Sequence, residues 1–115
     1  MPAEFSRHER TIICWPARRE LYGSRLGEAQ KAHAALANTI SGYEPVTMIA
    51  NPSDVDHARL ACNQNVDIVG LEIDDAWFRD SGPNYVFEDG NLLATCWVFN
   101  GWGEKFVPFD RDATI

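Results

Sequence analysis

A short stretch in the middle of the chain, DDAWFRDSGP at residues 74–83, gathers the residue types that could do chemistry. Aspartate, Gly and Pro are ordinary loop residues, but a Trp and a Phe between aspartates and an arginine are not. Trp77 and Asp80 stand three positions apart, so one helical turn would project both side chains to the same side. A carboxylate accepts two parallel hydrogen bonds from a guanidinium, and an indole face within about 6 Å attracts a cation. The pair therefore suits a planar cation better than a compact ammonium ion.

The neighbouring residues of this loop allow more than one interpretation. Asp74 and Asp75 could supply a second carboxylate, and we expect Arg79 to pair with one of them. Alternatively, Trp77 and Phe78 are core residues at a strand end, and the aspartates form a solvated turn. The residues alone leave both interpretations open. The loop lacks the regular spacing of oxygen donors in a calcium site, so no metal is predicted.

Length, composition and charge narrow the class of protein. The chain has 115 residues, which suits one small domain over residues 1–115. Apolar residues make up 45% and charged residues 23%, as in an ordinary soluble globular protein. No apolar run approaches the roughly 18 residues of a membrane span, and the polar N-terminal segment lacks the apolar core of a secretory signal. We therefore expect a cytoplasmic protein without a membrane partner. The net charge of −7 argues against nucleic acid and mildly favours cationic ligands.

The three cysteines, Cys14, Cys62 and Cys96, are far apart and lack CxxC spacing. An odd number at such distances argues against a disulfide framework or a zinc site. Each cysteine has apolar neighbours, so we expect buried and inert thiols. No cofactor is predicted.

The order of the elements before the loop predicts an α/β fold. Short apolar runs at 11–16, 45–51 and 65–73 read as strands, with helices expected at 20–41 and 53–63 between them. Such alternation implies parallel pairing through crossover helices. The loop at 74–83 leaves the end of the third strand, where ligand sites of open α/β sheets gather.

Two further patterns concern the helix at 20–41 and the segment after Pro83. The helix carries an apolar stripe with steps of three and four, made of Tyr22, Leu26, Ala29, His33, Leu36 and Ile40. Because His33 lies on this stripe, we expect it to be a packed residue.

After Pro83, two apolar runs flank Asp89-Gly90, a strong hairpin signal. A Gly-flanked loop with Trp102 at its centre follows.

Four ordered blocks carry a family resemblance: TIICWPARRE, YEPVTMIANP, DDAWFRDSGPNYVF and FNGWGEKF. In this order they resemble the N-terminal part of agmatine deiminases. These belong with the bacterial-type peptidylarginine deiminases, in the guanidine-modifying enzymes of pentein fold. The resemblance runs from about Arg10 to Asp112. It implies about two of the five modules of an α/β propeller, with mixed sheets and crossover helices.

The resemblance also implies a reaction and a set of site residues. A cysteine thiolate attacks the guanidinium carbon, ammonia leaves, and water hydrolyses the thiouronium intermediate. Agmatine then gives N-carbamoylputrescine, a precursor of the polyamine putrescine. The family's Trp-x-x-Asp arrangement matches Trp77 and Asp80, with Asp80 holding the guanidinium. Asn100 and Trp102, in the Gly-rich block, are expected to help line the pocket.

The family's cysteine nucleophile, in a Gly-rich segment, and its His-x-Asp motif have no counterpart in this chain. None of the three histidines is followed two residues later by Asp. We therefore expect the N-terminal part of such a hydrolase, inactive by itself and prone to self-association. The alternatives are a peptidylarginine deiminase part, a non-catalytic guanidinium-binding module and a structural remnant without a ligand.

Overall fold

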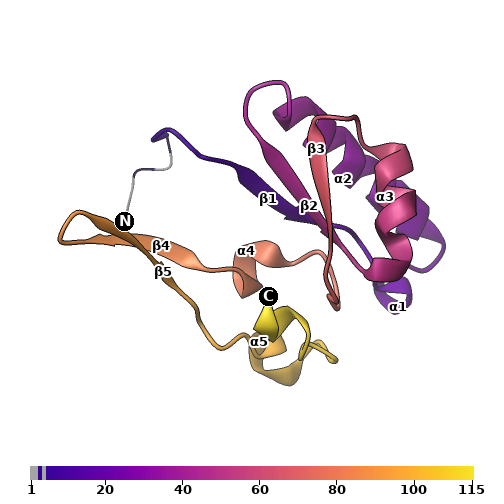
Figure 1. Cartoon of the computed structure of the whole chain (residues 1–115). Helices are drawn as coiled ribbons and strands as arrows, with labels where there is room; N and C mark the ends of the chain where they lie inside the picture. Colours follow the sequence, from indigo (N-terminus) through magenta and orange to yellow (C-terminus); the bar gives the residue numbers. More distant parts are fainter. Residues whose placement is uncertain (1–2, 4) are drawn as a thin grey trace.

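Three apolar runs pair side by side as a parallel sheet in the computed structural model, which describes residue 3 and residues 5–115 (Figure 1). The strands are β1 (Thr11–Cys14), β2 (Val46–Ala50) and β3 (Val66–Gly70), in the order β1-β2-β3. Every residue of β2 is buried, because this strand is central and both of its faces are covered. The predicted parallel pairing is confirmed.

The helices that connect the strands cover one face of this sheet (Figure 1). They are α1 (Arg19–Tyr22), the 3-10 turn η1 (Gly23–Arg25), α2 (Leu26–Ile40), the 3-10 turn η2 (Pro52–Asp54) and α3 (Val55–Ala61). The core between helices and sheet is made of Trp15, Ala34, Ala37, Val46, Met48, Ala50, Ala58 and Val66. Burial of this apolar surface is the main favourable term that holds the helices to the sheet.

The prediction of one unbroken helix at 20–41 is wrong at its start. Gly23 has a φ of 54°, outside the right-handed helical region, so α1 ends there and α2 begins at Leu26. The predicted apolar stripe is also displaced: Leu36 is 51% exposed, whereas Ala34 and Ala37 are buried. Small alanine side chains let the helix backbone approach the sheet, which the larger stripe residues would prevent. His33 is a packed residue as predicted, and its Nδ1 lies 3.1 Å from the carbonyl oxygen of Cys14.

The second connecting helix is shorter than predicted. After Asn51 the chain makes η2, and α3 then runs from Val55 to Ala61 rather than from 53 to 63. Among the cysteines, Cys14 is buried and Cys62 is half-buried, but Cys96 is exposed. The expectation of three buried thiols is therefore wrong for Cys96, because the strand before it carries no covering layer.

The second half of the chain lies on the other face of the sheet (Figure 1). It contains α4 (Phe78–Ser81), β4 (Asn84–Glu88), β5 (Asn91–Thr95), α5 (Gly101–Glu104) and the 3-10 turn η3 (Asp112–Thr114). A second buried cluster of Cys14, Ile49 and Ile73 joins this half to the sheet, and Phe78 and Ile115 pack against it. The fold is thus α/β, with one parallel and one antiparallel sheet.

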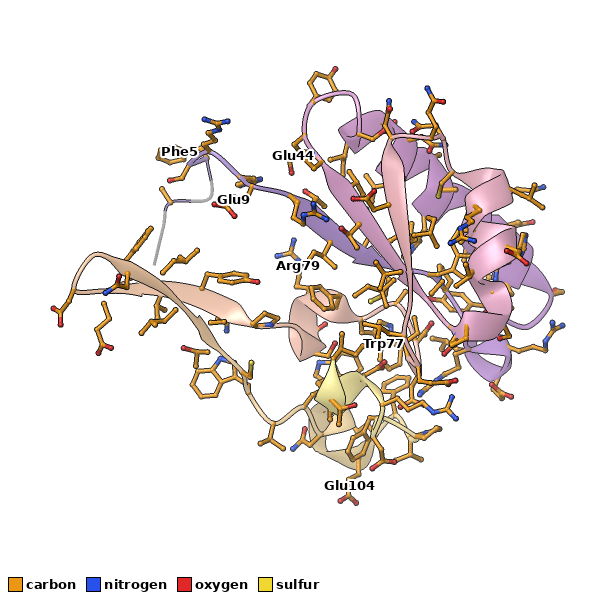
Figure 2. The ribbon with its side chains drawn as sticks, in the orientation of Figure 1. Phe5, Glu9, Glu44, Trp77, Arg79 and Glu104 are labelled. Atoms are coloured by element: carbon orange, nitrogen blue, oxygen red, sulfur yellow. The ribbon has the colours of Figure 1, made fainter. Side chains whose placement is uncertain are left out.

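Strands β4 and β5 form the predicted hairpin, with Asp89 and Gly90 at positive φ in its two-residue turn. The hairpin extends away from the sheet, and its side chains project from both faces (Figure 2). Large apolar side chains are exposed along it and just beyond it: Tyr85, Phe87, Leu92, Leu93, Trp97 and Val98. Within the described residues, each helix is too short or too polar to cross a lipid bilayer.

Candidate functional site

The loop at 74–83 starts at the carboxyl edge of the parallel sheet. Ile73, just before it, is buried, and its backbone N–H donates to Oδ1 of Asn51 over 2.9 Å. Asn51 directly follows β2, so this bond ties the ends of two neighbouring strands together. The loop therefore lies at the strand-end edge where a ligand site was predicted.

The centre of the loop makes the single helical turn that the Trp-x-x-Asp spacing suggested. Trp77 precedes the first residue of α4, and its carbonyl accepts from the N–H groups of Asp80 and Ser81 at 3.0 and 3.1 Å. Gly82 closes the turn with a 2.7 Å bond to the carbonyl of Phe78. A Cβ at Gly82 would lie 2.6 Å from that oxygen and 2.9 Å from the Phe78 ring, so the position accepts no side chain. This contact explains why a glycine stands at position 82.

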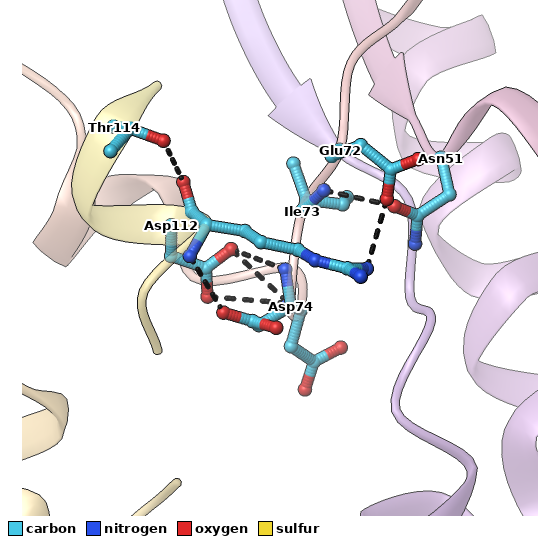
Figure 3. Close-up of polar contacts among 8 residues, drawn as sticks. Asn51, Glu72, Ile73, Asp74, Asp112 and Thr114 are labelled. Atoms are coloured by element: carbon cyan, nitrogen blue, oxygen red, sulfur yellow. Dashed lines mark hydrogen bonds and ion pairs between the residues drawn. The ribbon is translucent and has the colours of Figure 1, made fainter. Parts of the chain in front are cut away.

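The first aspartate of the loop is bound to the C-terminal turn (Figure 3). One carboxylate oxygen of Asp74 accepts from the backbone N–H of Arg111 at 3.0 Å. In return, the buried carboxylate of Asp112 accepts from the N–H groups of Asp74 and Asp75 at 2.7 and 3.2 Å. Burial raises the pKa of Asp112, and the nearby charges of Asp74 and Asp75 raise it too, while the two N–H groups act in the opposite direction.

The second aspartate of the loop, Asp75, faces inward and is only 1% exposed. Its Oδ1 accepts from the backbone N–H groups of Ala17 and Arg18 at 3.3 and 3.5 Å. Its Oδ2 is buried and makes no hydrogen bond of ordinary geometry, although the Tyr22 hydroxyl interacts with this carboxylate. Burial and the adjacent Asp75 carboxylate raise the pKa of the Tyr22 hydroxyl. Arg79 is exposed and forms no ion pair with Asp74 or Asp75 among the described contacts, so the expected pairing is wrong.

Asp80 is the one aspartate of this loop whose carboxylate is free among the described contacts. The residue is exposed, and its recorded hydrogen bond comes from its backbone N–H. The structure thus separates three carboxylates that look alike in sequence. Asp74 and Asp75 fix the loop, and the Asp80 carboxylate stays exposed.

Trp77 and Trp102, which lie far apart in sequence, contact each other. Their ring centroids are 4.7 Å apart with an interplanar angle of 63°. Phe106 contacts both indoles at 5.4 and 5.6 Å, and Phe99 contacts Trp102 at 5.2 Å. These edge-to-face arrangements are favourable for aromatic rings. The aromatic contacts therefore bring the loop at 74–83 against the Gly-rich block that carries Trp102.

Trp102 stands in a strained left-handed turn. The four residues of α5 have φ values between 56° and 76°, including the non-glycine residues Trp102 and Glu104. Oδ1 of Asn100 accepts from the N–H of Gly103 at 3.0 Å and so holds the turn. Left-handed conformations cost roughly 1–2 kcal/mol for residues with a Cβ, so surrounding contacts must compensate for it. Asn100 thus positions Trp102, whose side chain stays 41% exposed.

Two residues that sequence reasoning missed support this arrangement. The guanidinium carbon of Arg18 lies 4.9 Å from the Trp77 ring centroid, and its Nη2 donates to the carbonyl oxygen of Pro108. Arg18 follows β1, and its contact with Trp77 is long-range, so no local sequence pattern indicates it. The other missed residue is Asp112, which the fold brings to the loop from 37 and 38 positions away in sequence.

The two inward-facing cysteines are held in environments that disfavour the nucleophilic thiolate. Burial raises the pKa of Cys14 to about 12, and the charges of Asp112 and Asp75 add to this effect, so the thiol stays protonated. Burial also raises the pKa of Cys62, which packs on the helix-covered face of the sheet. These two buried or half-buried thiols are therefore poor candidates for a nucleophile at this loop.

Asp80 is exposed. Two hollows of about 850 Å³ and about 350 Å³ lie elsewhere, one beside residues 5–9 and 43–45, the other beside residues 59–68. Within residues 3 and 5–115, no three His, Cys, Asp or Glu side chains are arranged to hold a metal ion. The structure thus places Trp77 and Trp102 in contact and puts Asp80 on the same helical turn as Trp77.

Comparison with known sequences identifies relatives along the whole chain. The profile of the Porphyromonas-type peptidyl-arginine deiminases matches residues 1–115. A Streptomyces coelicolor protein provisionally named agmatine deiminase is 40% identical over 119 residues, and the agmatine deiminase of Pseudomonas aeruginosa strain LESB58 is 38% identical over 121. Both alignments cover 100% of this chain, but 35% and 33% of the relatives. The chain therefore spans about a third of their length.

Solved structures of relatives also match nearly the whole chain over about a third of their own length. An Enterococcus faecalis agmatine deiminase superposes with a TM-score of 0.91 at 27% identity, covering 98% of this chain and 32% of its own. A C. jejuni agmatine deiminase with substrate bound gives 0.82 at 27% identity, covering 96% and 32%.

Proposed function

Because the chain belongs to the Porphyromonas-type peptidyl-arginine deiminase family, we propose that it is the N-terminal part of an agmatine deiminase-like hydrolase. In this proposal Asp80 binds the guanidinium of agmatine, and the products are N-carbamoylputrescine and ammonia. The nucleophilic cysteine and the histidine come from outside residues 1–115.

One observation carries the proposal: Asp80 is the free carboxylate of the loop, on the same helical turn as Trp77. Asp74 and Asp75 each accept from backbone N–H groups, which leaves Asp80 as the exposed carboxylate of the loop without a protein partner among the described residues. A bidentate bond to Asp80 would orient the guanidinium plane and preserve its full charge. That orientation presents the central carbon to a thiolate, since alignment of reactants lowers the barrier.

The state of Cys14 and Cys62 supports a nucleophile from elsewhere. A thiol with a pKa of about 12, as at Cys14, contains almost no thiolate at neutral pH. The exposure of Asp80 also favours this assignment, because a reactive thiouronium needs a site that excludes bulk water until hydrolysis. The single partial domain at 1–115 would then provide one wall, as part of a propeller of five modules, and the remaining modules would provide the others.

A chimera tests the proposal. Residues 1–115 would replace the matching third of the Streptomyces coelicolor relative, and ammonia release from agmatine would be measured for the chimera and for the 115-residue chain. We expect turnover by the chimera and none above background by the chain. Failure of a folded chimera to turn over agmatine, while the parent relative does, would contradict the proposal.

The choice between free agmatine and a peptidyl arginine needs a second substrate in the same assay. Both carry the guanidinium that Asp80 would hold, and they differ at the other end. The names of the relatives favour agmatine. We expect the chimera to prefer agmatine over a blocked arginine peptide; the reverse preference would assign peptidylarginine as the substrate.

A further inference from the structure

The position of Arg18 is unusual for a charged side chain. The residue is only 9% exposed, although arginine is almost never buried without a charged partner. The ion pairs of the described residues do not include it. Its guanidinium is held by a carbonyl oxygen, that of Pro108, and by the face of an indole, that of Trp77.

The backbone of Arg18 is fixed independently of its side chain. Oδ1 of Asp75 accepts from the N–H groups of Ala17 and Arg18, so the end of β1 is attached to the loop at 74–83. The arginine is therefore presented to Trp77 in a defined direction.

The side chain of Arg18 connects the two segments that form the candidate site. Trp77 belongs to the loop that carries Asp80, and Pro108 belongs to the C-terminal segment that also carries Trp102 and Phe106. These aromatic rings contact one another at 4.7 to 5.6 Å. A planar guanidinium can bond to the carbonyl with its edge and stack on the indole with its face at once, which an ammonium cannot do.

We propose that Arg18 is a positioning residue, which fixes the indole of Trp77 against Trp102 and so holds the two segments of the site together. Its role toward a substrate rests on the proposed function. In the proposed site, the guanidinium of Arg18 covers one face of the Trp77 indole, so a guanidinium bound to Asp80 cannot stack on that face. Trp77 then acts as a fixed wall.

Substitution of Arg18 in the 115-residue chain tests the proposal by spectroscopy. The contact of Trp77 with Trp102 should give an exciton couplet in the circular dichroism spectrum, since the two indoles lie 4.7 Å apart at 63°. We expect Arg18→Met, which keeps the apolar stem, to lose most of this couplet. Arg19→Met is the matched control, because Arg19 is the exposed neighbour in sequence and should keep the couplet.

Chemical rescue separates positioning from general damage to the fold. Millimolar methylguanidinium should restore the couplet of Arg18→Met by occupying the vacated place on the indole, whereas methylammonium should not. A couplet of wild-type size in Arg18→Met would overturn the proposal, and so would a loss that methylguanidinium leaves unchanged. If Arg18→Met does not fold, Arg18→Lys should fold with a reduced couplet, and a wild-type couplet in that variant would overturn the proposal.

These spectra are recorded without agmatine. An inactive chimera would therefore refute the proposed function without changing the result for Arg18.

Discussion

At the residue scale, the environment of each carboxylate decides its role. Asp74, Asp75 and Asp80 lie within seven positions of one loop, but backbone N–H groups occupy the first two. Asp112, on η3, is fully buried and bonds back to the same loop. The loop is thus fixed by buried carboxylates at its start and leaves one exposed carboxylate on its helical turn.

The buried carboxylate of Asp112 should make stability depend on pH in a defined direction. Burial raises its pKa above the ordinary value of 3.8, so its contribution to stability is present when it is protonated. That contribution is lost as the pH rises through its folded-state pKa. We expect wild-type stability relative to Asp112→Asn to fall between pH 4 and pH 7, measured by urea unfolding. A relative stability that rises over this range would contradict the assignment.

The three thiols should differ in reactivity. Cys96 is exposed, whereas Cys14 is buried with a pKa raised to about 12. Brief alkylation of the native chain at neutral pH, followed by peptide mass spectrometry, should label Cys96 first and Cys14 only after unfolding. Cys96→Ser should remove the fast phase. Rapid labelling of Cys14 in the native chain would show that its thiol is accessible.

At the scale of elements, the turn that carries Trp102 depends on Gly101. A Cβ there would lie 2.4 Å from the carbonyl oxygen of Phe106 and 2.7 Å from the ring of Phe109, at a φ of 58°. We expect Gly101→Ala to lower the free energy of unfolding by at least about 1–2 kcal/mol, the usual cost of a left-handed alanine. Chemical denaturation followed by tryptophan fluorescence measures this loss.

A glycine in open space provides the control for that variant. Gly27 lies in α2 with nothing within 4 Å of a built Cβ. Gly27→Ala should therefore raise the free energy of unfolding by about 0.5–1 kcal/mol, because alanine favours the helix. Equal effects of the two substitutions would show that Gly101 has no special place in the turn.

Sequence patterns predict the elements where a local rule operates, and they miss what depends on distant contacts. The apolar runs predict all three parallel strands, and Asp89-Gly90 predicts the hairpin turn. The break at Gly23 was missed because the apolar stripe continues across it. Within the site, the spacing of Trp77 and Asp80 predicts their shared turn, but no local pattern brings Arg18 or Asp112 to the loop.

At the scale of the whole molecule, the hairpin β4–β5 exposes apolar surface on a two-stranded sheet whose outer edges are both unpaired. Cross-strand partners Phe87 and Leu92 are 57% and 50% exposed. Exposed apolar strands with free edges favour association. We therefore expect concentration-dependent self-association in sedimentation velocity, reduced by Phe87→Lys combined with Leu92→Glu. A monomer at all concentrations would contradict this expectation.

The most direct test of the account concerns Asp80 in the chimera with the Streptomyces coelicolor relative. Ammonia release from agmatine would be measured for the chimera, for Asp80→Asn and for Asp89→Asn, an exposed control in the hairpin turn. We predict that Asp80→Asn lowers kcat/KM at least about 30-fold, since loss of one partner in a buried charge pair costs about 2 kcal/mol or more. Asp89→Asn should retain the parent activity. Near-parental turnover by a folded Asp80→Asn chimera would contradict the assignment of Asp80 to the guanidinium.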